Sequence, residues 1–178
     1  MANILCNERD LCDGLSHCQK LTKVHLRHVD SDWSIARTNI LDAYYAFMHC
    51  PYLDSLALDS CAVITDHFIS RLSNLNRLTY VRLVKCNNIS ARGLEALFSK
   101  SMSQLRLVYI EQMVHLDDRA CVAMSRLPRL ARVCFVGCPN ITDQGIDCLI
   151  EAGKSVIPCR RRAIIEIKRT CTPSHNVP

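Results

Sequence analysis

Four stretches of this chain align with one another without a gap, and their regular spacing limits the possible folds more than any other feature. They are LDSLALDSCAVITD (53–66), LTYVRLVKCNNISA (78–91), LRLVYIEQMVHLDD (105–118) and LARVCFVGCPNITD (130–143). Their starts lie 25, 27 and 25 residues apart. Each has apolar residues at the same positions and a cysteine or methionine at the ninth. A period of this length indicates a solenoid of stacked repeats.

Each repeat reads as a short strand, a turn and a helix. Apolar residues alternate with period two in triplets such as LAL (56–58), which is typical of a strand with one face turned inward. The segments DHFISRLSNL (66–75) and DQGIDCLIEAG (143–153) have the apolar spacing of amphipathic helices. The polar residues expected to cap the helices are Thr65-Asp66, Ser90, Asp117-Asp118 and Thr142-Asp143. One unit cannot bury its apolar face alone, so the units are expected to stack.

The cysteine that follows each strand is interpreted as a packing residue. It points back into the narrow space between adjacent repeats, where a small apolar thiol is well accommodated. Cys61, Cys86 and Cys138 occupy this position, and the flexible Met113 replaces them in the third repeat. The apolar residues expected to close the turns are Ile64, Ile89, Leu116 and Ile141.

The ends of the array are less regular, although the whole chain, 1–178, is predicted to form one domain. A further repeat start is visible at LTKVHL (21–26), and a degenerate one at AIIEIK (163–168). Residues 8–50 are read as an N-terminal cap and a divergent repeat, residues 51–152 as the core repeats, and residues 153–178 as a C-terminal cap strand and tail. The expected parts of the ends are a helix at 8–21, a strand near 23–27, an insertion at 28–39, a helix at 40–50, an insertion at 153–163 and a last strand from 163.

The segment CPNITDQGI (138–146) carries the most specific signal, a C-x-x-I-T-D-x-G-I pattern. It resembles the cysteine-containing leucine-rich repeats of F-box proteins and of the yeast mitotic-exit antagonist family. The pattern is altered at 86–94, where Ser90-Ala91 replace Thr-Asp, and at 113–121, where the cysteine and glycine are absent. The resemblance is strong over 50–150 and looser over 10–170. It implies an α/β solenoid of five or six repeats, with a curved parallel sheet on the concave side and helices on the convex side.

The composition indicates a protein of a reducing compartment. The chain has twelve cysteines, which mostly lack close cysteine neighbours and fall in apolar periodic segments, so they are read as reduced and buried. Cytoplasm and mitochondrial matrix are both compatible with this reading. No run approaches the roughly 20 apolar residues that span a bilayer, which leaves only peripheral membrane contact. The net charge of +5 favours acidic partners without requiring nucleic acid.

Motifs that would indicate catalysis are missing. The chain has no phosphate-binding loop, no G-x-G-x-x-G, no G-x-S-x-G and no H-E-x-x-H, so we expect no enzyme, no catalytic residues and no cofactor. Cys6, Cys12 and Cys18 are spaced by six, with His17 beside the last. Zinc ligands usually come in pairs two to four residues apart, so these cysteines are read as packing residues rather than as a metal site.

The strand residues between the buried apolar positions are expected to face outward on the concave side. Tyrosine and arginine surrounded by aliphatic residues is the composition of a protein-binding hot spot, although strands favour aromatic and β-branched residues anyway. The candidate partner-binding residues are Lys23, His25, Arg27, Tyr80, Arg82, Val84, Leu107, Tyr109, Glu111, Arg132 and Val136. Ile164, Glu166 and Lys168 are expected to continue the same rows on the last strand.

A second candidate surface is the basic segment CRRRAIIEIKR (159–169). Positive charge there could meet RNA, anionic lipid or an acidic protein, or could belong to a solvated edge strand protected against unwanted pairing; the acidic protein and the edge strand are favoured. Nucleic acid is not favoured, because the aromatic residues that stack on bases are missing. The possible basic patch consists of Arg160, Arg161, Arg162, Lys168 and Arg169.

The favoured function is a non-catalytic protein–protein interaction module, as an accessory or structural subunit of a larger assembly. The alternative is the substrate-recognition component of a ubiquitin ligase, which the F-box relatives would imply, although residues 1–50 contain no recognisable F-box. A mitochondrial assembly is considered because short repeat proteins of similar pattern, such as the coupling factor B family of ATP synthase, have about this length. Partner identity cannot be read from the repeats, since the whole subfamily shares them.

Overall fold

The computed structural model describes residues 20–27, 50–62, 64–72, 75–99 and 102–159. Within them, six parallel strands form one sheet in the order β1-β2-β3-β4-β5-β6, so neighbours in sequence are neighbours in space. The strands are β1 (Lys23–Arg27), β2 (Ser55–Asp59), β3 (Tyr80–Val84), β4 (Leu107–Glu111), β5 (Arg132–Val136) and β6 (Ser155–Cys159). The helices are α3 (Asp66–Arg71), α4 (Ala91–Ser99), α5 (Asp118–Ser125) and α6 (Asp143–Glu151).

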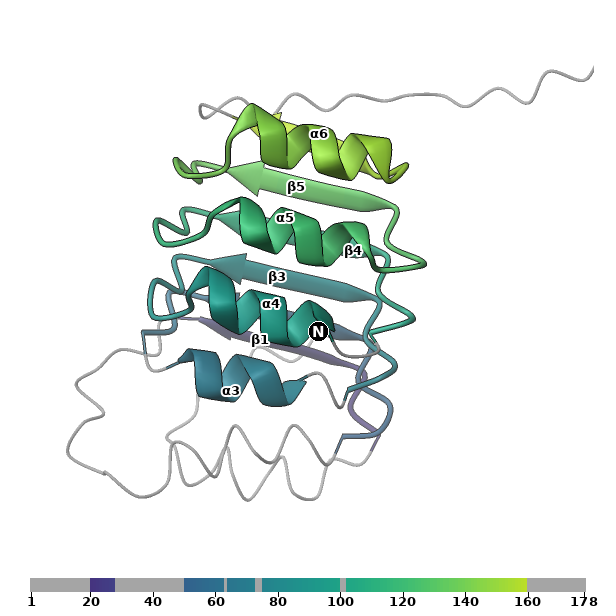
Figure 1. Ribbon diagram of the computed structural model, residues 1–178. Coiled ribbons are helices and arrows are strands. Elements are labelled where there is room, and N and C mark those ends of the chain that lie inside the picture. Colours follow the sequence, from purple (N-terminus) through teal and green to yellow (C-terminus); the bar gives the residue numbers. More distant parts are fainter. Residues whose placement is uncertain (1–19, 28–49, 63, 73–74, 100–101, 160–178) are drawn as a thin grey trace, which may run out of the picture.

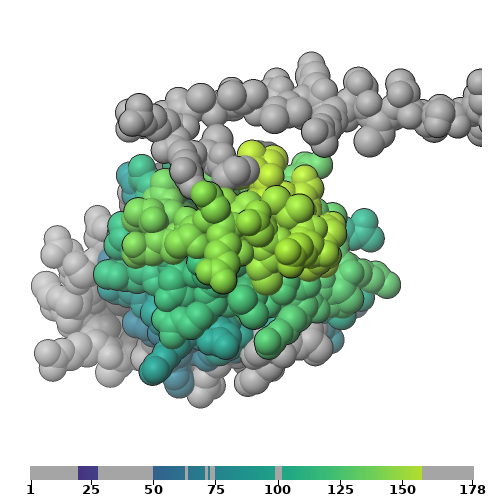
Figure 2. Space-filling view, turned by 45° about the horizontal axis from the view of Figure 1, so that its top comes forward, coloured from purple at the N-terminus to yellow at the C-terminus, as the bar shows by residue number. Residues whose placement is uncertain are grey.

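All helices of the described part cover the same face of the sheet, and each packs against the next. Figure 1 shows α3 to α6 stacked in chain order in front of the strands, and Figure 2, which looks toward the C-terminal end, shows green and yellow residues layered over teal ones. This is the predicted α/β leucine-rich-repeat solenoid, with the sheet on one side and the helices on the other. We call a strand together with its following helix a repeat unit.

The register of the sheet is the same at every strand pair. Ser55, Tyr80, Leu107, Arg132 and Ser155 are successive partners, so each strand starts level with the one before it. Residues at equivalent positions of the repeats therefore form straight rows across the sheet. The rows at the second and fourth strand positions are the buried ones and build the core with apolar residues of the helices.

The cysteines after the strands lie in that core, as predicted. Cys61 and Cys86 are fully buried, and Met113 takes the same place in the third aligned repeat. The thiol of Cys86 lies 3.4 Å from the carbonyl oxygen of Val84 and 3.7 Å from that of Leu58 in the preceding unit, so it donates weakly between units. Cys138 is only half-buried, because it lies near the C-terminal end of the described array.

The residue before each of these positions has a left-handed backbone. Ser60, Lys85, Gln112 and Gly137 have φ of 55°, 52°, 53° and 62°. Only the last is glycine, although a side chain costs free energy in this conformation. The turn is held by a main-chain bond along the stack, such as that of 2.9 Å from the Lys85 nitrogen to the Glu111 oxygen. The turn geometry therefore repeats even where the sequence is not ideal for it.

Aspartates at the starts of α3 and α5 link their helices to the helix of the next unit. Asp66 accepts hydrogen bonds from the main-chain nitrogen and the hydroxyl of Ser90, both 2.6 Å long. Asp118 accepts the equivalent pair from Thr142, at 2.9 and 2.5 Å. Thr65 and Thr142 stand at the N-cap positions, as predicted, but neither makes a side-chain capping bond to its own helix. At α6, Asp118 of the preceding unit bonds to the main chain and the hydroxyl of Thr142 instead.

The glycine of the repeat pattern makes room for this aspartate. A Cβ atom on Gly93 would lie 2.2 Å from Oδ1 of Asp66, and one on Gly145 would lie 2.2 Å from Oδ1 of Asp118. We call the sets Asp66–Ser90–Gly93 and Asp118–Thr142–Gly145 the first and the last junction. Glycine is needed there because of the neighbouring unit, since no unusual φ is involved at either residue.

The middle junction, between the two units that contain α4 and α5, lacks both partners. Alanine occupies the aspartate position at Ala91 and the glycine position at Ala120. Asp117 occupies the position that Ser90 and Thr142 hold at the other two junctions. It caps its own helix by accepting a hydrogen bond of 3.1 Å from the main-chain nitrogen of Arg119. The alanines at 91 and 120 therefore belong together, because a unit without the carboxylate does not require glycine in the unit that follows.

The last strand differs from the sequence-based prediction. β6 is formed by Ser155–Cys159, inside the segment read as an insertion, and it pairs with β5. The connection from helix to strand is short, because α6 ends at Glu151 and the backbone turns at Gly153, which has φ of 75°. Ser155 and Ile157 therefore continue the outward rows in place of Ile164 and Glu166, and Cys159 occupies the position assigned to Lys168.

Several other predictions fall outside the described residues. These are the helices at 8–21 and 40–50, the insertion at 28–39, the strand from 163, and the basic patch of Arg160, Arg161, Arg162, Lys168 and Arg169. The strand predicted near 23–27 is confirmed as β1.

Candidate interaction surface

The candidate residues lie on the face of the sheet that points away from the helices, which we call the open face. It carries the first, third and fifth residues of each strand, in straight rows set by the register. The structure brings all eleven predicted residues to this face: Lys23, His25 and Arg27 on β1, Tyr80, Arg82 and Val84 on β3, Leu107, Tyr109 and Glu111 on β4, and Arg132 and Val136 on β5. Val84 is only 4% exposed, which leaves it little surface to offer.

Arg82 is the centre of a charged cluster that spans three strands. Its guanidinium lies 3.6 Å from a carboxylate oxygen of Asp59 and 3.8 Å from one of Glu111. It also lies over the ring of Tyr109, 5.1 Å from the centroid. The side chains of Arg82, Asp59 and Glu111 are 24%, 19% and 26% exposed, so water still reaches the cluster. Asp59 was not among the predicted residues, although its position at the end of β2, level with Val84 and Glu111, would have placed it there.

Two tyrosines beside the cluster are held in the neutral form. Tyr109 donates a hydrogen bond of 2.9 Å to Glu111. Burial, that hydrogen bond and the negative charge of Glu111 raise the pKa of Tyr109 to about 12. Burial raises the pKa of Tyr80 as well, against the opposing effect of Arg82. Both phenols therefore stay neutral over the whole physiological range, and the single hydroxyl hydrogen of Tyr109 is used by Glu111.

The β1 end of the open face carries less charge than its sequence suggests. Burial, followed by the nearby cations Arg27 and Arg82, lowers the pKa of His25. The ring is therefore neutral at pH 7, and its Nε2 atom accepts a hydrogen bond of 3.1 Å from Nε of Arg27. Lys23 and Arg27 are exposed and charged, while His25 fixes the orientation of the arginine.

Groups that could bind a metal or cross a membrane were sought in the described part of the chain. There, no three histidine, cysteine, aspartate or glutamate side chains are arranged to hold a metal ion. None of the helices described is long and apolar enough to cross a bilayer. Seven cysteines of this part form no disulfide: Cys50, Cys61, Cys86, Cys121, Cys134, Cys138 and Cys148.

The sequence analysis missed the edge of the sheet where the strands begin. Arg77, Arg106 and Arg129 lie one to three residues before β3, β4 and β5 and are exposed. Arg77 and Arg129 stand just before the first apolar residue of their repeats, so they fell outside the aligned segments, whereas Arg106 is the second residue of its own repeat. Extending each aligned repeat by one residue toward the N-terminus would have shown Arg77 and Arg129 at the same position.

Comparison with known proteins supports the fold and nothing more specific. No family model matches the chain, and no curated protein matches it in sequence. The structure is similar to the C-terminal domain of tropomodulin from Caenorhabditis elegans, with a TM-score of 0.57 and 13% identity, covering 83% of this chain and 92% of that chain. At this identity the likeness concerns the fold alone, which is of the leucine-rich-repeat type.

Proposed function

We propose that this chain is a non-catalytic interaction module that binds a protein partner on the open face, around Arg82. The observation that carries the proposal is the cluster of Arg82, Asp59, Glu111 and Tyr109, because it holds an arginine and an aromatic ring in fixed positions on an accessible surface. Arginine and tyrosine dominate hot spots, and a side chain that is already ordered loses little entropy on binding.

The surroundings of the cluster support the same role. Tyr80 and Leu107 lie side by side as register partners next to it, and both are half-buried. A partner can therefore cover an apolar and aromatic centre while its polar groups meet the exposed Lys23, Arg27 and Arg132 at the periphery. This arrangement of an apolar centre and a polar rim is the usual anatomy of a protein interface.

In the cell, we propose an accessory or structural subunit of a larger assembly, in a reducing compartment such as the cytoplasm or the mitochondrial matrix. Seven cysteines of the described part form no disulfide and lie in buried or partly buried positions, which supports the compartment. The cysteine-containing repeat pattern supports kinship with the corresponding leucine-rich-repeat subfamily. A role in a ubiquitin ligase would need an adaptor-binding element beyond the described open face.

The test is quantitative affinity purification with the full chain and two triple variants. Tyr80→Ala, Arg82→Ala and Tyr109→Ala together remove the centre of the open face. Arg92→Ala, Glu95→Ala and Val122→Ala together change exposed residues of α4 and α5 and serve as the control. We expect the open-face variant to lose partners that the wild type and the control recover, while circular dichroism shows all three folded.

Recovery of the same partners by both variants would refute the assignment to the open face. The identities of the lost proteins decide the finer proposal. Subunits of one complex support the accessory role, and a ligase adaptor among the partners would replace it with the ligase alternative.

A further inference from the structure

A second surface lies along the edge where the strands begin, and its charge is unbalanced. The described residues that connect helices to strands there include six cations and a single carboxylate, that of Asp54. The cations are Lys20, Arg77, Arg106, Arg126, Arg129 and Lys154. At the opposite edge, the described turns that follow β2 to β5 carry only Lys85 and Asp117 as formal charges. We call the first of these the strand-start edge.

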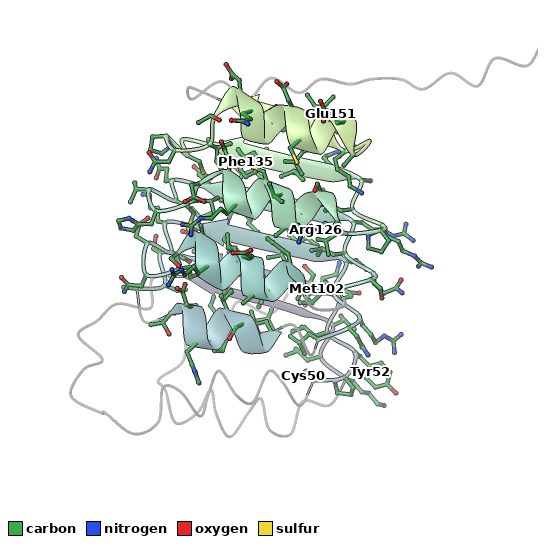
Figure 3. All side chains as sticks on the ribbon, in the orientation of Figure 1. Cys50, Tyr52, Met102, Arg126, Phe135 and Glu151 are labelled. Carbon is green, nitrogen blue, oxygen red and sulfur yellow. The ribbon has the colours of Figure 1, made fainter. Side chains whose placement is uncertain are left out.

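The fold holds these cations in a line. The main-chain nitrogen of Thr79 donates to the Asp54 oxygen at 2.8 Å, that of Arg106 to the Thr79 oxygen at 2.9 Å, and that of Ala131 to the Arg106 oxygen at 3.0 Å. Successive units are thus spaced at about the strand separation of 4.8 Å. In Figure 3, nitrogen-tipped side chains project to the right from this edge, where Tyr52 and Arg126 are labelled.

The described contacts of these cations are with neutral groups. Arg77 lies over the ring of Tyr52, 5.2 Å from its centroid. Arg129 donates to the side-chain oxygen of Gln104 at 2.5 Å, and Lys154 donates to the main-chain oxygen of Leu127 at 2.7 Å. Among the described residues, the ion pairs involve only Arg82 and Arg119, which lie elsewhere. Three of the six cations are therefore held by neutral groups, and none of the six forms an ion pair within the described residues.

Part of this charge has a structural explanation. Arg126 stands at the C-cap of α5, where a cation interacts favourably with the helix dipole. The same reason does not extend to Arg77 and Arg106, which lie beyond the ends of α3 and α4 by six and seven residues. Like charges placed along one edge repel one another, so their alignment favours a negatively charged partner.

A groove in the same edge gives a second reason to expect a ligand. It is open to solvent and lined mainly by hydroxyl and amide side chains of several units, among them Thr22, Asn76, Thr79 and Ser103, with Arg77, Tyr52 and the single carboxylate residue Asp54 also at its wall. Such groups can donate to carboxylates and can pair with an extended main chain. The groove and the line of cations thus present one continuous polar and positive track across repeat units.

We propose that the strand-start edge docks an acidic, extended segment of a partner protein, laid along the stack of units. A peptide is favoured over single-stranded nucleic acid, because Tyr52 is the single aromatic residue of the described edge and Arg77 already covers one of its faces. A peptide is favoured over an anionic membrane because the track is hollowed and lined with hydrogen-bonding groups. This surface is distinct from the open face around Arg82.

The experiment measures binding of a fluorescein-labelled decaglutamate peptide to the full chain by fluorescence anisotropy at several salt concentrations. The edge variant is Arg77→Gln, Arg106→Gln and Arg129→Gln together. The matched control is Lys85→Gln, Arg92→Gln and Arg119→Gln, which removes the same charge from exposed residues near the opposite edge. We expect the edge variant to bind about tenfold more weakly, the control to remain within about twofold of wild type, and added salt to weaken wild-type binding.

Three results would overturn the proposal. Equal losses in the edge variant and the control would show that only net charge matters. Tighter binding of a deoxythymidine decamer, or of phosphatidylserine vesicles, than of decaglutamate would reassign the edge to nucleic acid or to a membrane. The Tyr80, Arg82 and Tyr109 variant should bind decaglutamate like wild type, so the two surfaces can fail independently.

Discussion

The first and the middle junctions have the same backbone arrangement and hold their units together in different ways. At the first, a partly buried contact at the helix starts joins Asp66 to Ser90 next to a glycine. At the middle one, alanines replace both the aspartate and the glycine. There the polar contact lies on the opposite side of the sheet, where Arg82 of one unit meets Glu111 and Tyr109 of the next.

The difference teaches that the repeat pattern is conditional. The glycine is required only where the preceding unit supplies a carboxylate, and the carboxylate is tolerated only where the following unit has glycine. A motif that appears eroded in a single repeat is complete once residues from two adjacent repeats are considered together. The stability of the stack therefore depends on the contacts between neighbouring units as well as on each unit, as expected for a linear array.

The largest effect is expected from Gly93→Ala. The new Cβ would lie 2.2 Å from Oδ1 of Asp66, so the carboxylate must move and lose both bonds to Ser90. We expect the free energy of unfolding to fall by about 2–3 kcal/mol, measured by urea denaturation. The control is the same change in an Asp66→Ala background, where only the 3.0 Å approach to the Cα of residue 66 remains, so the loss should fall to about 1 kcal/mol or less. An equal loss in both backgrounds would contradict the coupling.

A smaller loss is expected when the missing carboxylate is introduced at the middle junction. Ala91→Asp alone should lower the free energy of unfolding by about 1–2 kcal/mol, because the new side chain meets the Cβ of Ala120 and the like charge of Asp117. Adding Asp117→Thr and Ala120→Gly recreates the last junction and should restore most of the loss. The idea fails if Ala91→Asp is harmless by itself in thermal and urea unfolding.

The smallest effect is a pH dependence at the middle junction, from Tyr109. Its pKa rises from 10.0 to about 12 on folding, so between these values the folded state binds more protons than the unfolded one. The stabilisation is full below pH 10 and is lost as the pH rises toward 12. Glu111→Gln should lower the pKa of this phenol, and Tyr109→Phe identifies its phenolate absorbance. An unchanged titration in Glu111→Gln would show that burial alone sets the shift.

Most of the fold could be predicted from the sequence, because the apolar alternation and the recurring cysteine report directly on burial. The strands β1 to β5 lie where the repeats predict them. β6 was missed because the repeat before it is shorter than the others, so residues 153–163 were read as an insertion; Pro158 lies within the strand. Proline is tolerated toward the edge of a sheet, where one side of the strand need not donate hydrogen bonds.

The candidate surface was predictable in outline and not in detail. The apolar alternation of each strand and the constant register decide which residues lie on the open face, so these residues could be named in advance. The pairing of Arg82 with two carboxylates depends on side-chain reach across neighbouring strands, and the neutral state of His25 depends on its burial. Neither is visible in a linear pattern. The glycine requirement was also hidden, because its cause lies in another repeat.

The conditional pairing of aspartate with glycine makes the repeats non-interchangeable. Removing residues 78–104 in register would place the repeat that contains Asp66 directly before the one that contains Ala120, and the carboxylate would meet a methyl group. Gain or loss of a whole repeat during evolution is thus restricted to exchanges that keep each unit with the aspartate directly before a unit with the glycine. A stack of this kind can change its length only where both neighbours fit.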